Sequence, residues 1–131
     1  MPTSPAATFE RPPLVPSAAS RIGLAVRRVD DVAMLDVMGS VTSDQATHLR
    51  ERVQELSGGG TKKFVVNLAQ VVHMDSSGVG ALLAVHKSIQ AAGGKCKFAR
   101  TPSQVLRTLQ RVNLHKVFEL FEDEGAALSS F

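Results

Sequence analysis

The length and composition of the chain limit what it can be. With 131 residues it has the size of one domain, so we expect no second catalytic or regulatory domain. Hydrophobic residues make up 44% and charged residues 21%, as in ordinary globular proteins, and no apolar run approaches the roughly 18 residues that cross a bilayer. We therefore expect no membrane-spanning segment.

The charge and the cysteine content bear on partners and on cellular compartment. The net charge is only +3 and there is no Trp or Tyr, so we do not expect direct binding to nucleic acid. The first 20 residues lack the basic start and apolar stretch of a secretion signal, and the single cysteine, Cys96, has no disulfide partner. Both observations favour the cytoplasm. Phe98 at strand spacing indicates that the Cys96 thiol lies in the core.

The charged residues are unevenly distributed along the chain. No acidic residue lies between Asp75 and Glu119, and an acidic cluster follows at 119–124. Two interpretations stay open: a solvated surface that carries both signs, or a basic flank that attracts an acidic protein partner. The basic residues of this stretch are Lys87, Lys95, Lys97, Arg100, Arg107, Arg111 and Lys116.

The N-terminal third predicts a tail, a hairpin and a helix. Five of the six prolines lie in the first 16 residues, so we expect residues 1–20 to form a flexible tail and residues 21–131 one domain. Apolar runs on either side of Asp30-Asp31 predict two hairpin strands, 24–29 and 32–37, closed by Gly39. The T-x-x-Q pattern at 42–45 is typical of a capping box, and the helix it opens has apolar residues at Ala46, Leu49, Val53 and Leu56 and ends at Gly58-Gly59-Gly60.

The rest of the chain alternates strands with helices. Residues 64–68 read as a buried strand, 75–92 as a helix stopped by Gly93-Gly94, and 96–99 as a strand. A second capping-box pattern at 101–104, with Pro102 at the first helical position, opens a helix with an apolar stripe of Val105, Leu109 and Val112. A strand at 117–121 and a short helix favoured by the acids at 122–124 complete the chain.

This order of elements predicts the fold class. The order ββαβαβαβ(α) is typical of an α/β domain in which right-handed crossovers connect parallel strands. We therefore expect a mixed, mostly parallel sheet of about five strands, flanked by helices that cover it with their apolar stripes.

The segment 64–80 places two serines where a buried strand gives way to a helix. A helix N-terminus offers unpaired N–H groups and a partial positive charge, so a phosphate there gains hydrogen bonds and favourable dipole energy. Physical chemistry alone leaves two interpretations. Asp75 or Ser76 caps the helix and does nothing more, or a serine hydroxyl accepts a phosphoryl group without disturbing the helix.

The stretch NLAQVVHMDSSGVGALLAVHKSIQAAGGK resembles the signature of the STAS domain, specifically of bacterial anti-sigma factor antagonists, and the resemblance covers about residues 21–131. Its most specific element is Asp75-Ser76-Ser77-Gly78-x-Gly80, followed by Gly93-Gly94. The resemblance implies that Ser76 is the phosphoacceptor, in a loop with Asp75, Ser77 and Gly78. The implied partner is both an anti-sigma factor and a serine kinase. It is bound by the unphosphorylated antagonist, and a serine phosphatase resets the switch.

One departure from the family concerns the loop that precedes the first predicted helix. The family usually has a G-x-[LIV]-D pattern there, whereas Gly39-Ser40-Val41-Thr42 ends in threonine. The hydroxyl of Thr42 and the charge of Asp44 are the candidates for that role in partner binding. The same departure keeps an alternative open, a STAS adaptor or scaffold that assembles a signalling or lipid-transport complex without being phosphorylated.

A stripe of small side chains on the second predicted helix is the candidate partner surface. The helical wheel puts Val79, Leu82, Leu83 and Ile89 toward the core. It leaves a face in line with Ser77 on which a partner can approach closely, made of Gly80, Ala81, Ala84, Ser88 and Ala91. The alternative is an Ala-rich exposed helix chosen for helix propensity alone.

Enzymatic sites are disfavoured by spacing. We expect no catalytic triad of His73, Asp75 and Ser76, because sequence neighbours around a strand end rarely reach the geometry that a triad needs. No G-x-S-x-G elbow is present either. Gly78-Val79-Gly80 lacks the third glycine of a dinucleotide site. The four histidines are too widely spaced for a metal site, and His86 is expected to be a hydrogen-bonded core residue. The other three histidines are His48, His73 and His115. We therefore expect a binding module without cofactor or metal rather than an enzyme.

Overall fold

The computed structural model describes residues 22–131, without the side chains of Ile22 and of residues 43–45, so the predicted tail lies outside the described residues. None of the described helices is long and apolar enough to cross a membrane. In chain order the elements are β1 (Ile22–Val29), β2 (Val32–Val41), α1 (Ser43–Gly58), β3 (Lys63–Met74), α2 (Ser76–Ala91), β4 (Lys95–Ala99), α3 (Ser103–Arg111), a 3-10 turn (Leu114–Lys116), β5 (Glu119–Phe121) and α4 (Glu124–Ser129).

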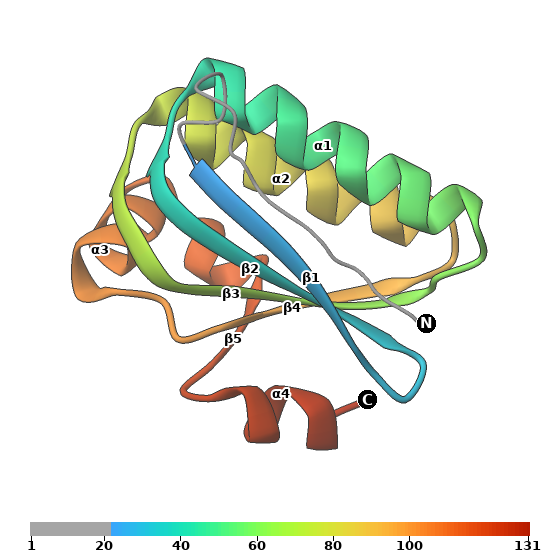
Figure 1. Ribbon diagram of the computed structural model, residues 1–131. Coiled ribbons are helices and arrows are strands. Elements are labelled where there is room, and N and C mark those ends of the chain that lie inside the picture. Colours follow the sequence, from blue (N-terminus) through green and yellow to red (C-terminus); the bar gives the residue numbers. More distant parts are fainter. Residues whose placement is uncertain (1–21) are drawn as a thin grey trace.

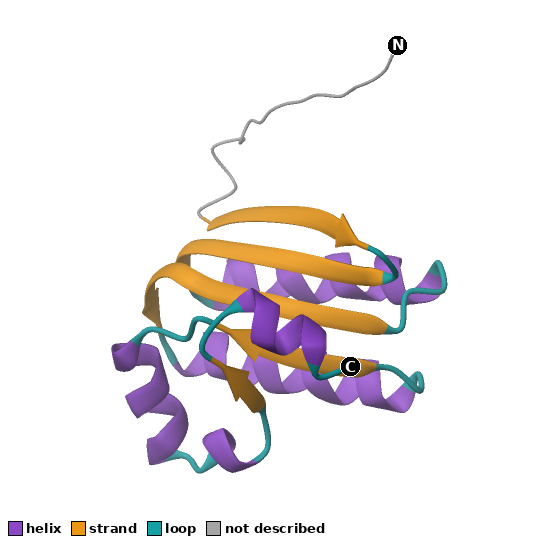
Figure 2. Cartoon of the chain, turned by 90° about the horizontal axis from the view of Figure 1, so that it is seen from below, coloured by secondary structure: helices purple, strands orange, loops and turns teal. Residues whose placement is uncertain are grey.

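The five strands form one sheet in the order β1-β2-β3-β4-β5. β1 pairs antiparallel with β2 through the predicted two-residue turn, in which Val29 lies opposite Val32, and the other neighbours pair in parallel. α1 and α2 lie side by side over one face of the sheet, and α4 lies on the other (Figure 1, Figure 2). The predicted fold class, an α/β domain with a mixed and mostly parallel sheet, is therefore confirmed.

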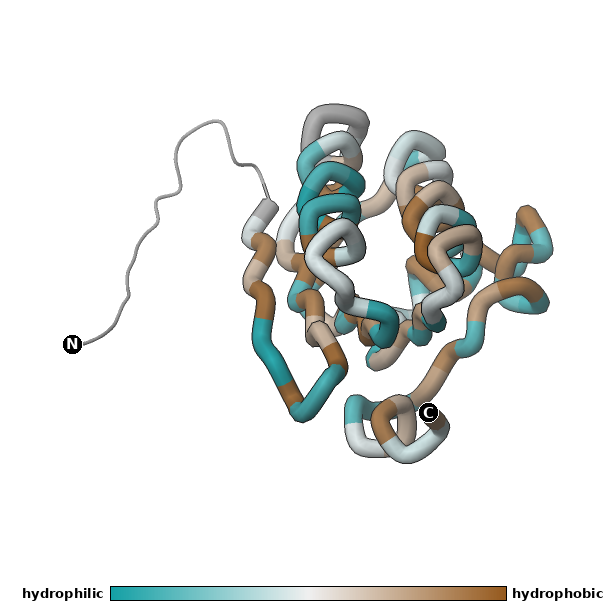
Figure 3. The backbone as a smooth tube through the Cα atoms, turned by 90° about the vertical axis from the view of Figure 1, so that its right-hand side faces the viewer, coloured by the Kyte–Doolittle hydropathy of each residue, from teal (hydrophilic) through white to brown (hydrophobic). Residues whose placement is uncertain are grey.

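The main hydrophobic core lies between the sheet and the helix pair. Figure 3 shows α1 and α2 next to each other above the strands, and α2 carries more hydrophobic residues along its length than α1. Burial of a large aliphatic or aromatic side chain contributes about 1.5–3 kcal/mol each, so this layer supplies most of the stabilisation. Its fully buried members include Leu35, Leu49, Phe64, Leu82, Phe98 and Leu109.

A smaller core lies under α4 on the opposite face of the sheet, where Met34, Val65 and Ala127 are buried. Lys97 belongs to this layer, although the sequence placed it in the basic flank. Its side chain is only 5% exposed, its Nζ lies 2.8 Å from Glu119 Oε1, and it contacts the rings of Phe121 and Phe131. Neither interpretation of the basic stretch, a solvated surface or a flank that attracts a partner, therefore holds for Lys97, because its charge is paired inside the fold.

β2 and β3 are longer than the sequence indicated. β2 continues through Gly39, which has a φ of 90°, to Val41, and β3 continues past Leu68 to Met74. The pairing of the two strands is irregular between Asp36 and Met38 and again after Gly39. These irregularities interrupt the alternation of inward and outward side chains, so the period-two pattern is lost in the sequence while the strands continue.

Other helix and strand boundaries also differ from the expected ones. Thr42 is the N-cap of α1, but its side chain makes no capping hydrogen bond; Pro102, rather than Thr101, is the N-cap of α3. Val112 lies just beyond α3 and is 53% exposed, so it is not part of the buried stripe. The predicted strand at 117–121 is reduced to β5, since the chain forms a 3-10 turn just before it.

Gly94 allows β4 to begin close to the strand next to it. A Cβ on Gly94 would collide with the carbonyl oxygen of Lys62, which accepts a hydrogen bond from the backbone N–H of Lys95 at 2.7 Å. We expect Gly94→Ala to lower the free energy of unfolding by about 1–3 kcal/mol, because the obstructing atom is backbone and cannot rotate away.

Denaturant unfolding measures this effect, and Gly58→Ala is the matched control. A Cβ on Gly58 meets no atom within 4 Å, so that variant is expected to be as stable as the parent or slightly more stable. Equal midpoints for the Gly94→Ala variant and the parent would show that the contact is not tight.

Candidate functional site

The loop between β3 and α2 is held by a side-chain cap. Asp75 is the N-cap of α2 in extended backbone conformation, and its Oδ1 accepts a hydrogen bond of 3.0 Å from the backbone N–H of Gly78. This is the capping role that the sequence left open for Asp75, and such a cap contributes about 1 kcal/mol. The cap leaves both serine side chains, Ser76 and Ser77, exposed in the first turn of α2.

Gly78 lets the start of α2 lie directly against the ends of two strands. A Cβ there would come within 2.5 Å of the Val41 carbonyl oxygen and 2.7 Å of Met74 Cγ. Val41 is also paired with Met74 in the sheet. This register brings Thr42, the half-buried residue after β2, next to Asp75. Asp44 lies in the first turn of α1, and its side chain lies outside the described residues.

Ser76 lies on the wall of a largely apolar groove between α2 and α3. On α2 it is followed at one-turn intervals by Gly80 and Leu83, which line the same groove. Figure 1 shows α3 at the same end of the sheet as the start of α2. The groove has a volume of about 600 Å³, and its other lining residues are Met74, Asp75, Val79, Thr108, Arg111, Val112 and Leu114.

Ser77 points along a different line of the helix. Ala81 and Ala84 follow it at helical spacing, then Ser88, and these small side chains lie toward α1. Ala81 is only 4% exposed, and Ala84 and Ser88 border a hollow of about 70 Å³ with Arg50, Val53 and Gln54 of α1. Inclusion of Ala81 in an exposed partner surface is therefore wrong: the small residues let α1 and α2 pack closely.

The groove combines apolar walls with a single basic side chain. Arg111 is the one cation among the lining residues, and it makes no ion pair with any side chain that the structure describes. Val112 and Leu83 add apolar surface at the groove. Sequence reasoning did not connect Thr108, Arg111 and Val112 with Ser76, because nothing in the sequence indicates that the end of α3 lines the same groove. Leu83 was assigned wholly to the core. Its position seven residues after Ser76, two helical turns further on, places it on the same side of α2 as Ser76.

The residues considered for a catalytic triad form no hydrogen-bonded chain among the described residues. His73 is exposed near the end of β3, and no hydrogen bond joins it to Ser76 in the part of the chain that the structure describes. Among residues 22–131 no group of three His, Cys, Asp or Glu side chains is placed to hold a metal ion. Cys96 is buried as predicted, and burial raises the pKa of its thiol, which keeps it protonated.

His86 lies in the core as predicted, but it does not have the expected hydrogen bond on Nδ1. Its side chain packs against the ring of Phe118 at 5.2 Å, and Nδ1 has no partner among the described residues. Burial is the main cause that lowers the pKa of His86 below its usual value of about 6.5, whereas the charge of Glu119 opposes this shift. The neutral imidazole is the form that the folded state favours.

The sign of this pKa shift predicts a pH dependence of stability. Below about pH 6.5 the unfolded chain takes up a proton at His86 more readily than the folded chain does, so the free energy of unfolding falls as the pH drops. The loss ends once the pH is below the pKa of the folded state. Urea unfolding at a series of pH values measures this effect.

A pair of variants tests whether His86 is the source of this pH dependence. His86→Phe, which replaces the imidazole with another ring, is expected to remove this part of the pH dependence. The control His73→Gln changes an exposed histidine and is expected to keep it. Identical pH profiles for His86→Phe and the parent would contradict the assignment.

Comparison with known proteins identifies the family. The family model of the STAS domain matches residues 24–127. The chain belongs to the STAS domain family. The match includes β2, the β3–α2 loop and the Ser76 groove, so this site lies within the STAS domain itself.

Similar solved structures share the fold of this STAS domain. A putative anti-sigma factor antagonist from Thermotoga maritima has a TM-score of 0.77 at 23% identity, with 82% of this chain and 92% of that chain covered. An anti-sigma factor antagonist from Mycobacterium paratuberculosis has a TM-score of 0.75 at 21% identity, covering 88% and 97%. The Bacillus cell fate determinant SpoIIAA in its phosphorylated form has a TM-score of 0.67 at 17% identity, covering 82% and 98%.

Proposed function

We propose that this STAS domain is an anti-sigma factor antagonist of the cytoplasm, switched by phosphorylation of Ser76. In its unphosphorylated form it binds a protein that is both an anti-sigma factor and a serine kinase, and so releases a sigma factor; a serine phosphatase restores it. The observation that carries the proposal is the exposed Ser76 side chain in the first turn of α2, on the wall of an apolar groove. The domain acts by binding and is not itself an enzyme.

The position of Ser76 suits a reversible phosphate. The first turn of α2 has unpaired backbone N–H groups and the positive end of the helix dipole, so an added phosphate is stabilised without unfolding the helix. Phosphorylation adds about 1.5–2 negative charges. Because these charges lie next to Asp75 at a largely apolar groove, a partner that covers the groove then meets electrostatic repulsion and the cost of burying the phosphate.

The groove, rather than the stripe of small residues, is the proposed partner surface. A kinase that transfers a phosphoryl group to Ser76 must bring its active site to the groove wall, so it covers the residues beside that serine. Gly80 stays in this surface, because it is exposed and lines the groove. Thr42 and Asp44 flank the loop and stay proposed contacts, whereas Ala84 and Ser88 lie on the side that faces α1.

A kinase assay with serine variants tests the switch. We expect the cognate kinase with ATP to modify Ser76, as read by phosphopeptide mapping, and Ser76→Asp to lose kinase binding by at least about tenfold. Ser76→Ala is expected to stay bound and active, and the matched control Ser77→Ala to be phosphorylated normally. A protein left unmodified at Ser76 by its kinase would overturn the proposal.

Two exposed valines test the partner surface. Val112→Glu places a carboxylate in the groove and is expected to weaken binding of the kinase by about tenfold or more, as measured by calorimetry. Val72→Glu is the matched control, since Val72 is 65% exposed and does not line the groove. Melting temperatures show that both variants fold. Equal losses of affinity in the two variants would rule out the groove as the contact.

A STAS adaptor that is never phosphorylated is the second candidate. The observation that favours it is Thr42, which lies next to Asp75 where the resemblance calls for an acidic residue. An adaptor forms a stable complex whose affinity does not change in Ser76→Asp, whereas the switch requires a loss. The same binding measurement therefore separates the two functions.

A further inference from the structure

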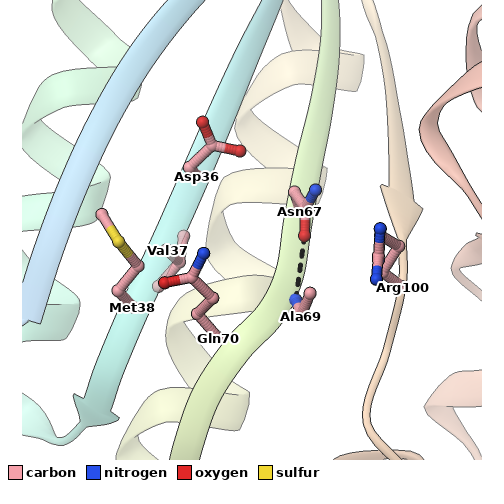
Figure 4. A pocket seen from close by; sticks show the side chains of 7 residues that line it. All are labelled: Asp36, Val37, Met38, Asn67, Ala69, Gln70 and Arg100. Carbon is pink, nitrogen blue, oxygen red and sulfur yellow. Dashed lines mark hydrogen bonds between the residues drawn. The ribbon is translucent and has the colours of Figure 1, made fainter.

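A second hollow lies on the face of the sheet opposite to α1 and α2. It has a volume of about 290 Å³ and is formed by β2, β3 and the residue after β4 (Figure 4). Figure 4 views it with the helix pair behind the strands. The hollow and the Ser76 groove share no lining residue, so a ligand can occupy the hollow whether or not Ser76 is phosphorylated. Its lining residues are Asp36, Val37, Met38, Asn67, Ala69, Gln70 and Arg100.

The hollow exists because the sheet is irregular at this place. β4 ends at Ala99, opposite Asn67, while β3 continues for seven residues to Met74 without that neighbour. The pairing of β2 with β3 is also irregular between Asp36 and Met38. The Asn67 Oδ1 accepts a hydrogen bond of 2.9 Å from the Ala69 N–H and so supports the backbone at the irregularity. Bulges of this kind often re-aim side chains next to binding sites.

Arg100 borders the hollow in an unusual backbone conformation. Its φ is 57°, in the left-handed region that residues other than glycine rarely adopt, although its N–H is held by the Phe121 carbonyl at 3.0 Å. Its side chain is exposed. Arg100 makes no ion pair with the residues that the structure describes. A strained residue thus presents an uncompensated guanidinium to the hollow.

The acidic side chain of the hollow, Asp36, is paired with an arginine. Arg27 donates two hydrogen bonds to Asp36, from Nε at 2.6 Å and from Nη2 at 2.8 Å, and a third to Glu124 at 2.5 Å. Asn67 also donates to Glu124. This network of two carboxylates and one guanidinium carries one net negative charge, and the carboxylate of Glu124 lies outside the lining. A ligand with one negative charge is therefore favoured over a dianion, which the network would repel more strongly.

The geometry points to a binding site for a small ligand that carries one carboxylate group, held by the fork of Arg100 on one side of β3, with the side-chain amide of Gln70 on the other side (Figure 4). A guanidinium presents two parallel N–H donors that match the two oxygens of a carboxylate, and the amide adds a donor and an acceptor for a neighbouring polar group. Met38 and Ala69 supply apolar contact. The hollow is large enough for a molecule of a few carbon atoms.

Titration of the full chain with lactate, followed by the amide shifts in nitrogen–proton correlation spectra, tests this site. We expect saturable shifts at Ala69, Gln70 and Arg100, and affinity that is lower by about tenfold for lactamide, the neutral isostere of lactate. Inorganic phosphate is expected to bind more weakly than lactate. Shifts that never saturate, equal shifts with lactamide, or tighter binding of phosphate would each overturn the proposal.

Arginine variants assign the ligand contact. Arg100→Gln is expected to lower the affinity for lactate by about tenfold, and the matched control Arg107→Gln, an exposed arginine of α3 that does not line the hollow, is expected to leave it unchanged. Arg100→Gly accepts the positive φ without strain, so it keeps the fold while removing the guanidinium. Binding of lactate to Arg100→Gly as tight as to the parent would show that the assignment is wrong.

Discussion

The seating of α2 on the ends of β2 and β3 is the contact on which the site depends. Gly78 lets the first turn of the helix approach the Val41 carbonyl and the side chain of Met74 more closely than any larger residue permits. The side chain of Asp75 caps the same turn by accepting a hydrogen bond from the Gly78 N–H. The backbone of this turn is packed below and capped at its start, and both of its serines are exposed. Exposure of Ser76 is thus a consequence of close packing beneath it.

The two adjacent serines have different surroundings because a helix advances about 100° per residue. Ser76 begins a line of residues on α2 that borders α3. Ser77, the next residue, begins a line that packs against α1. The alanines on the second line have small side chains, which two close helices require, and the groove on the first line exists because α3 stands away from α2. In the switch that we propose, a phosphate on Ser76 would act on the groove and leave the helix pair undisturbed.

The two faces of the sheet differ in how completely helices cover them. The face under α1 and α2 is closed by a continuous apolar layer. The other face is only partly closed by α4, through a small core and through the ion pair of Arg27 with Glu124. Polar side chains remain accessible where that cover ends, and both the irregular pairing of β3 and the early end of β4 fall there. Of the charged residues in the C-terminal third, Lys97, Glu119 and Glu124 form ion pairs within the fold.

The sequence by itself determined the order of elements, the α/β class, the hairpin and the position of Ser76 at a helix start, because alternation, helical spacing and turn residues are local signals. Only the tertiary structure decided which side of α2 is free, since Ala81 is small and apolar whether it faces solvent or another helix. It also decided that Lys97 is buried, that β3 reaches Met74 and that Val112 lies beside Ser76. These features arise from contacts between residues far apart in the chain, and no local pattern encodes such contacts.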